Sequence, residues 1–469
     1  MATINPNMFD KLSDSLLFII LTFLPFKEAA RTSILSKRWR HIWRATSNME
    51  FNERFFVKPD DFGSNREIQR RVFIDFAKQW MESYQEPVVK NFSLTFARPL
   101  DEPMVLDSCV RFALAHNVKE LGLDFSDPQW EKHNLDCYTG RSYDLPLIGN
   151  VYEHRVLESL KLFSCNFNLS GLCNLHSLRH LSLGWIGLNA SNVKDLLVNC
   201  KLLESLSLVS CHGLDYLQIE GQSLQLKSLV IDSCEITSKW LLIEAPKLRC
   251  LKFVGWIGIF EILVKNCMEE AYLDFGYEYE FGELGEILYK LLDDLYPVKV
   301  LTVCSYMLQV IPCGVEPLSI SPPLNVKHLT LRTALHDNEF YGIKFMLKSC
   351  PSLETLTIEI DNRHRIFPDY VAPFKESWEK SPLIVYKCMC KSLKWVEIKG
   401  FKGTYNEAYL LRYVICFGLV MEKLNIYISK EVDASGTGSP GSQQVYLRRA
   451  QQISEFKKTS PRLQIAIFD

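Results

Sequence analysis

One short pattern of apolar residues recurs along most of the chain and limits the folds that it can adopt. The pattern is an apolar residue, two further residues, an apolar residue, one further residue and an apolar residue, as in Leu203-Leu206-Leu208. Its thirteen copies begin at Val89, Val118, Leu157, Leu178, Leu203, Leu226, Leu248, Glu270, Val298, Val326, Leu353, Leu393 and Met421. Consecutive copies start 21 to 29 residues apart, except for two intervals of 39 and 40 residues. This recurrence indicates an array of short structural repeats.

The residues between the apolar positions indicate that each copy is a strand with one apolar and one polar, solvent-facing side. Small or polar side chains fill those positions, for example Ser205 and Ser207 or Thr355 and Thr357. Successive side chains of a strand point to opposite faces, so the leucines lie on one face and the polar residues on the other. Intervals of 20 to 29 residues are typical of leucine-rich repeats. The sequence therefore predicts an α/β chain with a curved leucine-rich-repeat solenoid whose parallel strands line the concave face.

Helix-like stretches are expected between strands, each followed by a cysteine. They precede Cys200, Cys267 and Cys350, and the stretch before Cys267 is Ile262-Leu263. The chain has 15 cysteines, an odd and scattered set that does not indicate a disulfide framework. The closest pair, Cys388 and Cys390, has no histidine at zinc-ligand spacing. We therefore expect buried thiols, no metal and no cofactor.

Residues 8–46 differ from the repeats and predict three short helices. The first, 14–24, is apolar nearly all round, can be capped by Ser13 or Asp14 and ends at Pro25. The second is expected at 26–33 and the third at 36–46, where Trp39 and Trp43 are spaced to form an aromatic pair. About forty residues cannot bury so apolar a helix alone. Part of this surface should meet the repeats, as a terminal cap, or another protein.

The N-terminal module resembles the F-box of plant F-box/leucine-rich-repeat proteins. The resemblance lies in residues 10–17, 20–25 and 29–43, and its most specific part is TSILSKRWR at residues 32–40. Where the family usually has Leu-Pro, this chain has Leu12-Ser13, which implies reduced adaptor affinity. The resemblance implies docking on a Skp-type adaptor, which joins a cullin and a RING subunit. The adaptor-binding residues that it implies are Leu12, Leu16, Leu17, Ile20, Leu21, Leu24, Pro25, Leu35, Trp39 and Trp43.

The C-terminal part is similar to the FBD domain that closes many of these plant proteins. The similarity runs through 393–403, 421–424 and 456–465. With the F-box, it suggests three domains: F-box 8–46, leucine-rich-repeat solenoid 47–375 and FBD-like cap 376–469. The implied function is substrate recognition in an SCF-type ubiquitin ligase, without a catalytic site in this chain.

The wet face of the strands is the expected site for a target protein. Aromatic and charged side chains interrupt its serines and threonines, and such residues are enriched in interface hot spots. The predicted target-binding residues are Phe163, Lys252, Arg332, Glu359, Trp395, Lys399 and Tyr427. Several belong to the last strands, so the C-terminal half of this face is the predicted docking site.

Composition excludes several other classes of function. The formal charge of −2 argues against a general nucleic-acid binder, so the basic cluster 31–44 is read as a solvated helix face. The longest apolar run, 16–24, is too short for a membrane span, which places the expected site of action in the cytosol or nucleus. The common nucleotide-binding, hydrolase and metalloprotease motifs are missing. A repeat scaffold without ligase activity, or a small-molecule co-receptor using Arg332 and Lys399, remain alternatives.

Overall fold

The computed structural model divides the chain into two compact units. It describes residues 8–58, 64–97, 101–127, 151–165, 174–264, 267–278, 284–311, 319–361, 365–367, 385–430 and 441–468. The first unit is Met1–Leu214 with Ser223–Gln225, and the second is Asp215–Gln222 with Leu226–Asp469. The units separate inside the repeat array, so the domain boundaries 8–46, 47–375 and 376–469 stay predictions.

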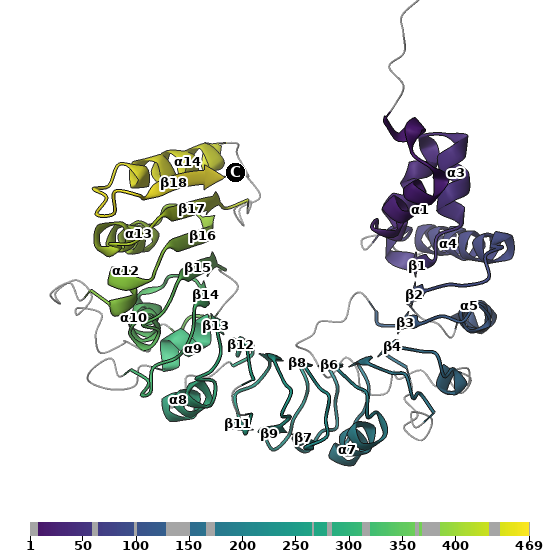
Figure 1. Ribbon diagram of the computed structural model, residues 1–469, viewed down its shortest axis with the longest axis horizontal. Helices are drawn as coiled ribbons and strands as arrows, with labels where there is room; N and C mark the ends of the chain where they lie inside the picture. The colour runs from purple at the N-terminus through teal and green to yellow at the C-terminus, as the bar shows by residue number, and fades with distance from the viewer. Residues whose placement is uncertain are drawn as a thin grey trace, which may run out of the picture. The chain divides into compact units, whose positions relative to one another are not determined.

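The first unit contains the N-terminal helices and six parallel strands (Figure 1). Strands β1 to β6 pair side by side in chain order, each parallel to the next. The elements are η1 (Met8–Lys11), α1 (Asp14–Thr22), α2 (Phe26–Arg31), η2 (Thr32–Ile34), α3 (Lys37–Arg44), β1 (Asn48–Asn52), η3 (Glu53–Phe55), α4 (Ser64–Ser83), β2 (Asn91–Thr95), α5 (Pro103–Ala115), β3 (Glu120–Asp124), β4 (Ser159–Phe163), β5 (His180–Gly184), α7 (Ala190–Asn199) and β6 (Ser205–Val209).

The second unit continues the same architecture. Its main sheet is parallel from β8 to β18, and helices α8, α10, α12 and α13 lie along one face of it (Figure 1). The elements are β7 (Leu217–Glu220), β8 (Ser228–Asp232), β9 (Trp240–Glu244), β10 (Cys250–Val254), β11 (Ile259–Ile262), β12 (Glu270–Asp274), α8 (Gly285–Asp294), β13 (Val300–Cys304), α9 (Ser305–Val310), β14 (His328–Thr333), η7 (Asp337–Glu339), α10 (Phe340–Ser349), β15 (Thr355–Ile360), α12 (Lys387–Lys391), β16 (Trp395–Phe401), α13 (Tyr405–Phe417), β17 (Lys423–Ile428), α14 (Gly441–Ser454) and β18 (Gln464–Phe468).

The fold class and the register of the strands agree with the sequence prediction. Every predicted copy has a strand, and its pattern leucines are buried with at most 2% exposure: Leu160, Leu181, Leu206, Leu229, Leu251, Leu329 and Leu356. Equivalent leucines of neighbouring strands lie side by side in register, as Leu329 and Leu356 do. Within each unit the apolar residues therefore form a core between the sheet and the segments behind it.

One copy of the pattern is aligned wrongly in the sequence prediction. Strand β12 pairs Leu251 with Ala271 and Phe253 with Leu273, so the true copy is Met268-Ala271-Leu273. The predicted copy Glu270-Leu273-Phe275 lies two residues too late. The error arose because Leu273 and Phe275 have the same two-residue spacing as Ala271 and Leu273. Both are larger and more apolar than Ala271, so they matched the pattern better.

The second sheet is a further departure from the prediction. Strands β7, β9 and β11 form a parallel three-stranded sheet in the order β11-β9-β7. The predicted helix at Ile262-Leu263 is wrong, because Ile259–Ile262 is strand β11. Correctly aligned copies here start only 20 to 23 residues apart. A strand rises further per residue than a helix, so it spans the same distance with fewer residues. A connection this short therefore has room for a strand but not for a helix.

A residue with left-handed backbone geometry ends several strands. Ser164, Trp185, Ser210 and Ser233 have φ between 50° and 60° and each directly follows a strand. Left-handed geometry is uncommon for residues other than glycine, so its repetition marks a shared turn. The turn directs the chain away from the sheet at the same point in successive repeats.

The described cysteines are thiols, and no disulfide joins them. Eight of these twelve are buried: Cys109, Cys165, Cys200, Cys211, Cys234, Cys304, Cys350 and Cys388. Burial raises the pKa of Cys109 to about 12 and that of Cys304 to about 12, although Lys78 lowers the former slightly. Cys200 and Cys350 follow helices α7 and α10, as predicted.

Within the described ranges, no helix is long and apolar enough to cross a membrane.

Candidate interaction surfaces

The N-terminal helices begin where the sequence provides a cap. The Ser13 hydroxyl accepts a hydrogen bond from the Leu16 amide at 3.3 Å, and the Ser36 hydroxyl accepts one from the Trp39 amide at 3.3 Å. Each bond satisfies an amide that the first helical turn leaves without a partner. Arg38 of α3 pairs with Asp14 of α1 at 2.6 Å, which ties the third helix to the first.

Aromatic side chains anchor these helices on the first strand and on α4. Trp43 stacks on Trp80 of α4 with ring centroids 4.3 Å apart, and Phe26 lies edge-on to both Trp43 and Trp80. Trp39 instead contacts Phe9, with centroids 5.9 Å apart. The expected pairing of Trp39 with Trp43 is therefore replaced by separate contacts. Trp43 serves the junction between the module and the first repeat.

Four of the ten predicted adaptor-binding residues lie in the interior of the module, and their role in adaptor binding stays a prediction. Leu17, Leu21, Trp39 and Trp43 are buried within the chain, with 0% to 8% exposure, and hold the module together. Leu12, Ile20 and Leu24 are partly buried, and Leu16, Pro25 and Leu35 are exposed. A helix that is apolar on every side does not reveal which side its own module covers, so the sequence could not separate these two sets.

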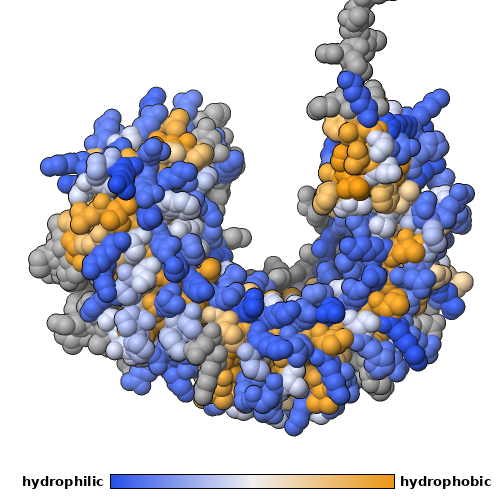
Figure 2. All heavy atoms as spheres, in the orientation of Figure 1, coloured by the Kyte–Doolittle hydropathy of each residue, from blue (hydrophilic) through white to orange (hydrophobic). Residues whose placement is uncertain are grey.

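Three exposed apolar residues were missing from the predicted set. Ile19, Phe23 and Ile34 are 50%, 81% and 84% exposed. Leu16, Ile19 and Phe23 are three and four residues apart, so they share one face of α1 and its C-terminal turn. Together with Ile34 and Leu35, which are also exposed, we call these residues the module face. Figure 2 shows hydrophobic atoms gathered over the N-terminal helices.

The second surface is the side of the sheet that carries no helices, which we call the strand face. Its side chains come from the first, third and fifth residues of each strand, as Thr355, Thr357 and Glu359 do in β15. Charges along it are largely paired between neighbouring strands. Lys399 lies 3.0 Å from Glu359, and residues just before the strands pair as Lys327–Glu354 at 2.7 Å and Lys394–Glu422 at 3.8 Å.

Arg332 lies in a network of acidic groups rather than standing free on the strand face. Its guanidinium donates to Asp274 and to the Tyr272 hydroxyl, and lies 3.4 Å from Asp361. Burial raises the pKa of Tyr272 to about 12, so its hydroxyl stays protonated at neutral pH. Lys252 pairs with Asp232 at 3.3 Å near the same tyrosine ring. We therefore expect Arg332 to contribute to the stability of the fold as well as to the strand face.

The remaining predicted target-binding residues differ in how they are held. Trp395 is 53% exposed, whereas Tyr427 stacks on Phe468 with ring centroids 4.7 Å apart. In the first unit, Lys161 lies 4.3 Å from the ring of Phe163. That ring covers Gly184, where an added Cβ would be 2.8 Å from it, so the glycine makes room for the aromatic ring.

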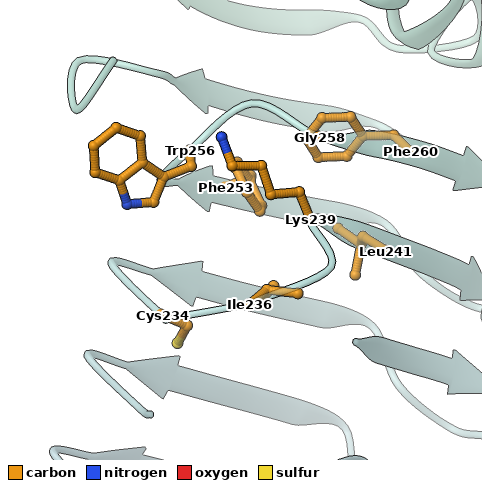
Figure 3. Close-up of a pocket in the computed structure, with 8 residues that line it drawn as sticks. All are labelled: Cys234, Ile236, Lys239, Leu241, Phe253, Trp256, Gly258 and Phe260. Carbon is orange, nitrogen blue, oxygen red and sulfur yellow. The ribbon is translucent and has the colours of Figure 1, made fainter. Parts of the chain in front are cut away.

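One small cavity opens between the turns after β8 and β10 (Figure 3). Its volume of about 20 Å³ has room for roughly one water molecule. Its lining is mostly apolar, and Lys239 extends toward Trp256 with its ammonium 5.5 Å from the ring. Nothing larger than a water molecule fits there. Among the described residues no three histidine, cysteine or acidic side chains gather to hold a metal ion.

Comparison with known proteins assigns both parts of the chain. The family model described as "At1g61320/AtMIF1, LRR domain" matches residues 81–443, and the F-box domain model matches residues 9–50. The putative F-box/LRR-repeat protein At5g54820 of Arabidopsis thaliana is 34% identical over 453 residues, which cover 93% of this chain and 94% of the relative. The F-box protein At3g62230 of the same plant is 32% identical over 418 residues, covering 89% and 90%.

The repeat match spans well over half of the chain, and the relatives align along nearly its full length. The chain belongs to the plant F-box/LRR-repeat proteins.

Proposed function

We propose that this protein is the substrate-recognition subunit of an SCF-type ubiquitin ligase. The F-box binds a Skp-type adaptor, which joins a cullin and a RING subunit, and the strand face binds a target protein. Ubiquitin is transferred by other subunits. This chain contributes proximity and orientation, so it needs no catalytic residue of its own.

The module face is the observation that carries the proposal. Phe23, Ile34 and Leu35 are each more than 60% exposed, on a module that already has a buried core of its own. Large apolar side chains gathered on the surface of a folded domain mark an interaction site. They belong to the segment that matches the F-box domain, whose general partner is a Skp-type adaptor.

A pull-down with a purified Skp-type adaptor tests this proposal. Changing Ile34→Asp together with Leu35→Asp should reduce adaptor binding at least tenfold, since truncation of a central interface residue commonly costs about 2 kcal/mol or more. Met104→Asp is the matched control, because Met104 is 80% exposed on α5, outside the module. Leu21→Asp is a poor test, since Leu21 is buried and its loss would unfold the module. Undiminished binding by the double variant contradicts the proposal.

The part assigned to target recognition is the C-terminal half of the strand face. Exposed Trp395, the Lys399–Glu359 pair and the stacked Tyr427 support it, because aromatic and charged groups stand there among small polar residues. The similarity of 376–469 to an FBD domain fits this role, since β16, β17 and β18 extend the sheet in that segment. We also propose that the protein acts in the cytosol or nucleus.

A further inference from the structure

An open depression lies at the beginning of the last three strands of the second unit. Its volume is about 460 Å³, and its lining is Trp395, Glu422, Lys423, Arg462 and Gln464. Three of these side chains are strand partners, because Trp395 lies opposite Lys423 and Lys423 opposite Gln464. The shared register places the indole, the ammonium and the amide in one row across β16, β17 and β18.

The charges of this depression differ from those of the ion pairs on the strand face. Elsewhere in the second unit the cations Lys327, Arg332 and Lys399 each contact a carboxylate. Within the described part of the chain, Lys423 and Arg462 form no ion pair or side-chain hydrogen bond. The one carboxylate of the lining, Glu422, pairs with Lys394 at 3.8 Å. The depression therefore holds two cations whose charge nothing in the described structure balances.

An exposed indole beside the two cations adds an apolar contact surface. Trp395 is 53% exposed, while the pattern residues on either side of it, Leu393 and Val396, are buried. Tryptophan is the residue most often found in interface hot spots, together with arginine and tyrosine, and its ring packs well against aliphatic side chains. The combination suits a partner that offers carboxylates next to an apolar residue.

We propose that this depression binds an acidic segment of the target protein, in which carboxylate side chains flank an apolar residue. The carboxylates pair with Lys423 and Arg462, and the Gln464 amide donates a hydrogen bond to one of them. The apolar residue packs on Trp395. This inference rests on the proposed role of the repeats in target capture, and it specifies the chemistry of the target.

Selection from a library of random peptides, with the immobilised full-length protein as bait, tests the preference directly. The enriched peptides should combine aspartate or glutamate with leucine or an aromatic residue. One enriched peptide, labelled with fluorescein, then serves as the probe for fluorescence anisotropy. The double variant Lys423→Glu/Arg462→Glu and the single variant Trp395→Ala should each weaken its binding at least about tenfold. Added salt should weaken binding to the wild-type protein, because solvent-exposed charge pairs are screened.

The controls use positions with matching properties outside the depression. Lys299→Glu introduces the same charge reversal just before strand β13, and Tyr405→Ala removes an aromatic residue that is 71% exposed on α13. Both should leave peptide affinity within about twofold of wild type. Circular dichroism must show that all variants are folded, and the milder Arg462→Gln replaces the double variant if that one is not. Enrichment of basic or uncharged peptides, or equal affinity for the double variant, overturns the inference.

Two further outcomes separate this inference from the proposed function. A fluorescein-labelled oligouridylate that binds as tightly as the acidic peptide, and loses binding in the double variant, would show a site for phosphate groups and contradict the inference. Adaptor pull-down should be unchanged in every variant of the depression. Failure of the wild-type protein to bind adaptor would defeat the ligase assignment while leaving the peptide preference to stand on its own result.

Discussion

The N-terminal module and the repeats differ in how far their apolar side chains are exposed to solvent. The module exposes Phe23 and Ile34 at 81% and 84%, whereas the pattern leucines of the repeats are almost completely buried. The strand face instead presents serines, threonines and paired charges. Apolar surface gives binding energy without much directional preference, whereas polar and charged groups favour specificity and association rate. The module thus suits one constant partner, and the strand face suits discrimination among many.

The largest effect should separate the interiors of the two regions from their surfaces. Leu356→Ala removes a fully buried side chain from β15, and it should lower the free energy of unfolding by about 2–5 kcal/mol. Ile34→Ala should change it by less than about 0.5 kcal/mol, because Ile34 is exposed. Urea titration followed by circular dichroism measures both. Similar losses of unfolding free energy for the two variants would contradict the conclusion that Leu356 is buried and Ile34 exposed.

Arg332→Ala should have the next largest effect, since it tests whether charges on the strand face are structural. The change leaves Asp274 and Asp361 without their shared cation, and Asp274 is only 9% exposed. A hydrogen bond to a charged group contributes about 1.5–3 kcal/mol, so the loss should be of that order. The same titration measures this loss. A variant as stable as wild type would place Arg332 among the residues that are free to bind a target.

Lys399→Ala sharpens the comparison with a more exposed pair. Lys399 and Glu359 lie 3.0 Å apart, with side chains 47% and 37% exposed. Exposed pairs of this kind contribute about 0.2–1 kcal/mol, and salt reduces the contribution. Stability should therefore fall slightly at low salt and become equal to wild type near molar salt. A loss that persists at high salt would mean that the lysine stem packs on the sheet.

Ser13→Pro, in the N-terminal module, should have the smallest effect of all, and the quantity to measure is adaptor affinity. The preorganised proline ring should by itself raise adaptor affinity by about 0.4–1 kcal/mol. The structure shows that Ser13 already caps α1 through the Leu16 amide, and removing such a cap costs about 1 kcal/mol. The Ser13 φ of −67° suits proline, so the two effects should nearly cancel. Titration calorimetry with the adaptor would detect a clear gain or loss, which would show that one effect dominates.

The repeats were predictable because their signal is redundant. Burial of one face forces period-two alternation in every strand, and twelve of thirteen copies had the correct alignment. The second sheet was missed because the interval length, and not the apolar pattern, distinguishes a strand from a helix behind the main sheet. Strand β1 was missed because its Met49 and Phe51 follow Thr46, which breaks the apolar pattern.

The interaction surfaces were less predictable, for a physical reason. The sequence of α1 is apolar at nearly every position, so only its packing against neighbouring elements such as α3 decides that Leu17 is buried and Ile19 exposed. On the strand face, alternation correctly placed Trp395 and Lys399 outside. It could not show that Arg332 is neutralised by Asp274 from a strand two places away, because that pairing depends on which strands are neighbours.

The buried thiols have a consequence for the life of the molecule under oxidising conditions. Cysteine reacts with oxidants as the thiolate, and burial raises the pKa of Cys109 and of Cys304 to about 12, so these thiols are ionised far more rarely at neutral pH than exposed ones. Unfolding exposes the same sulfur atoms to water and returns them to ordinary acidity. Peroxide therefore spares the interior of folded chains and modifies those that have opened, so that oxidation at these positions records past unfolding.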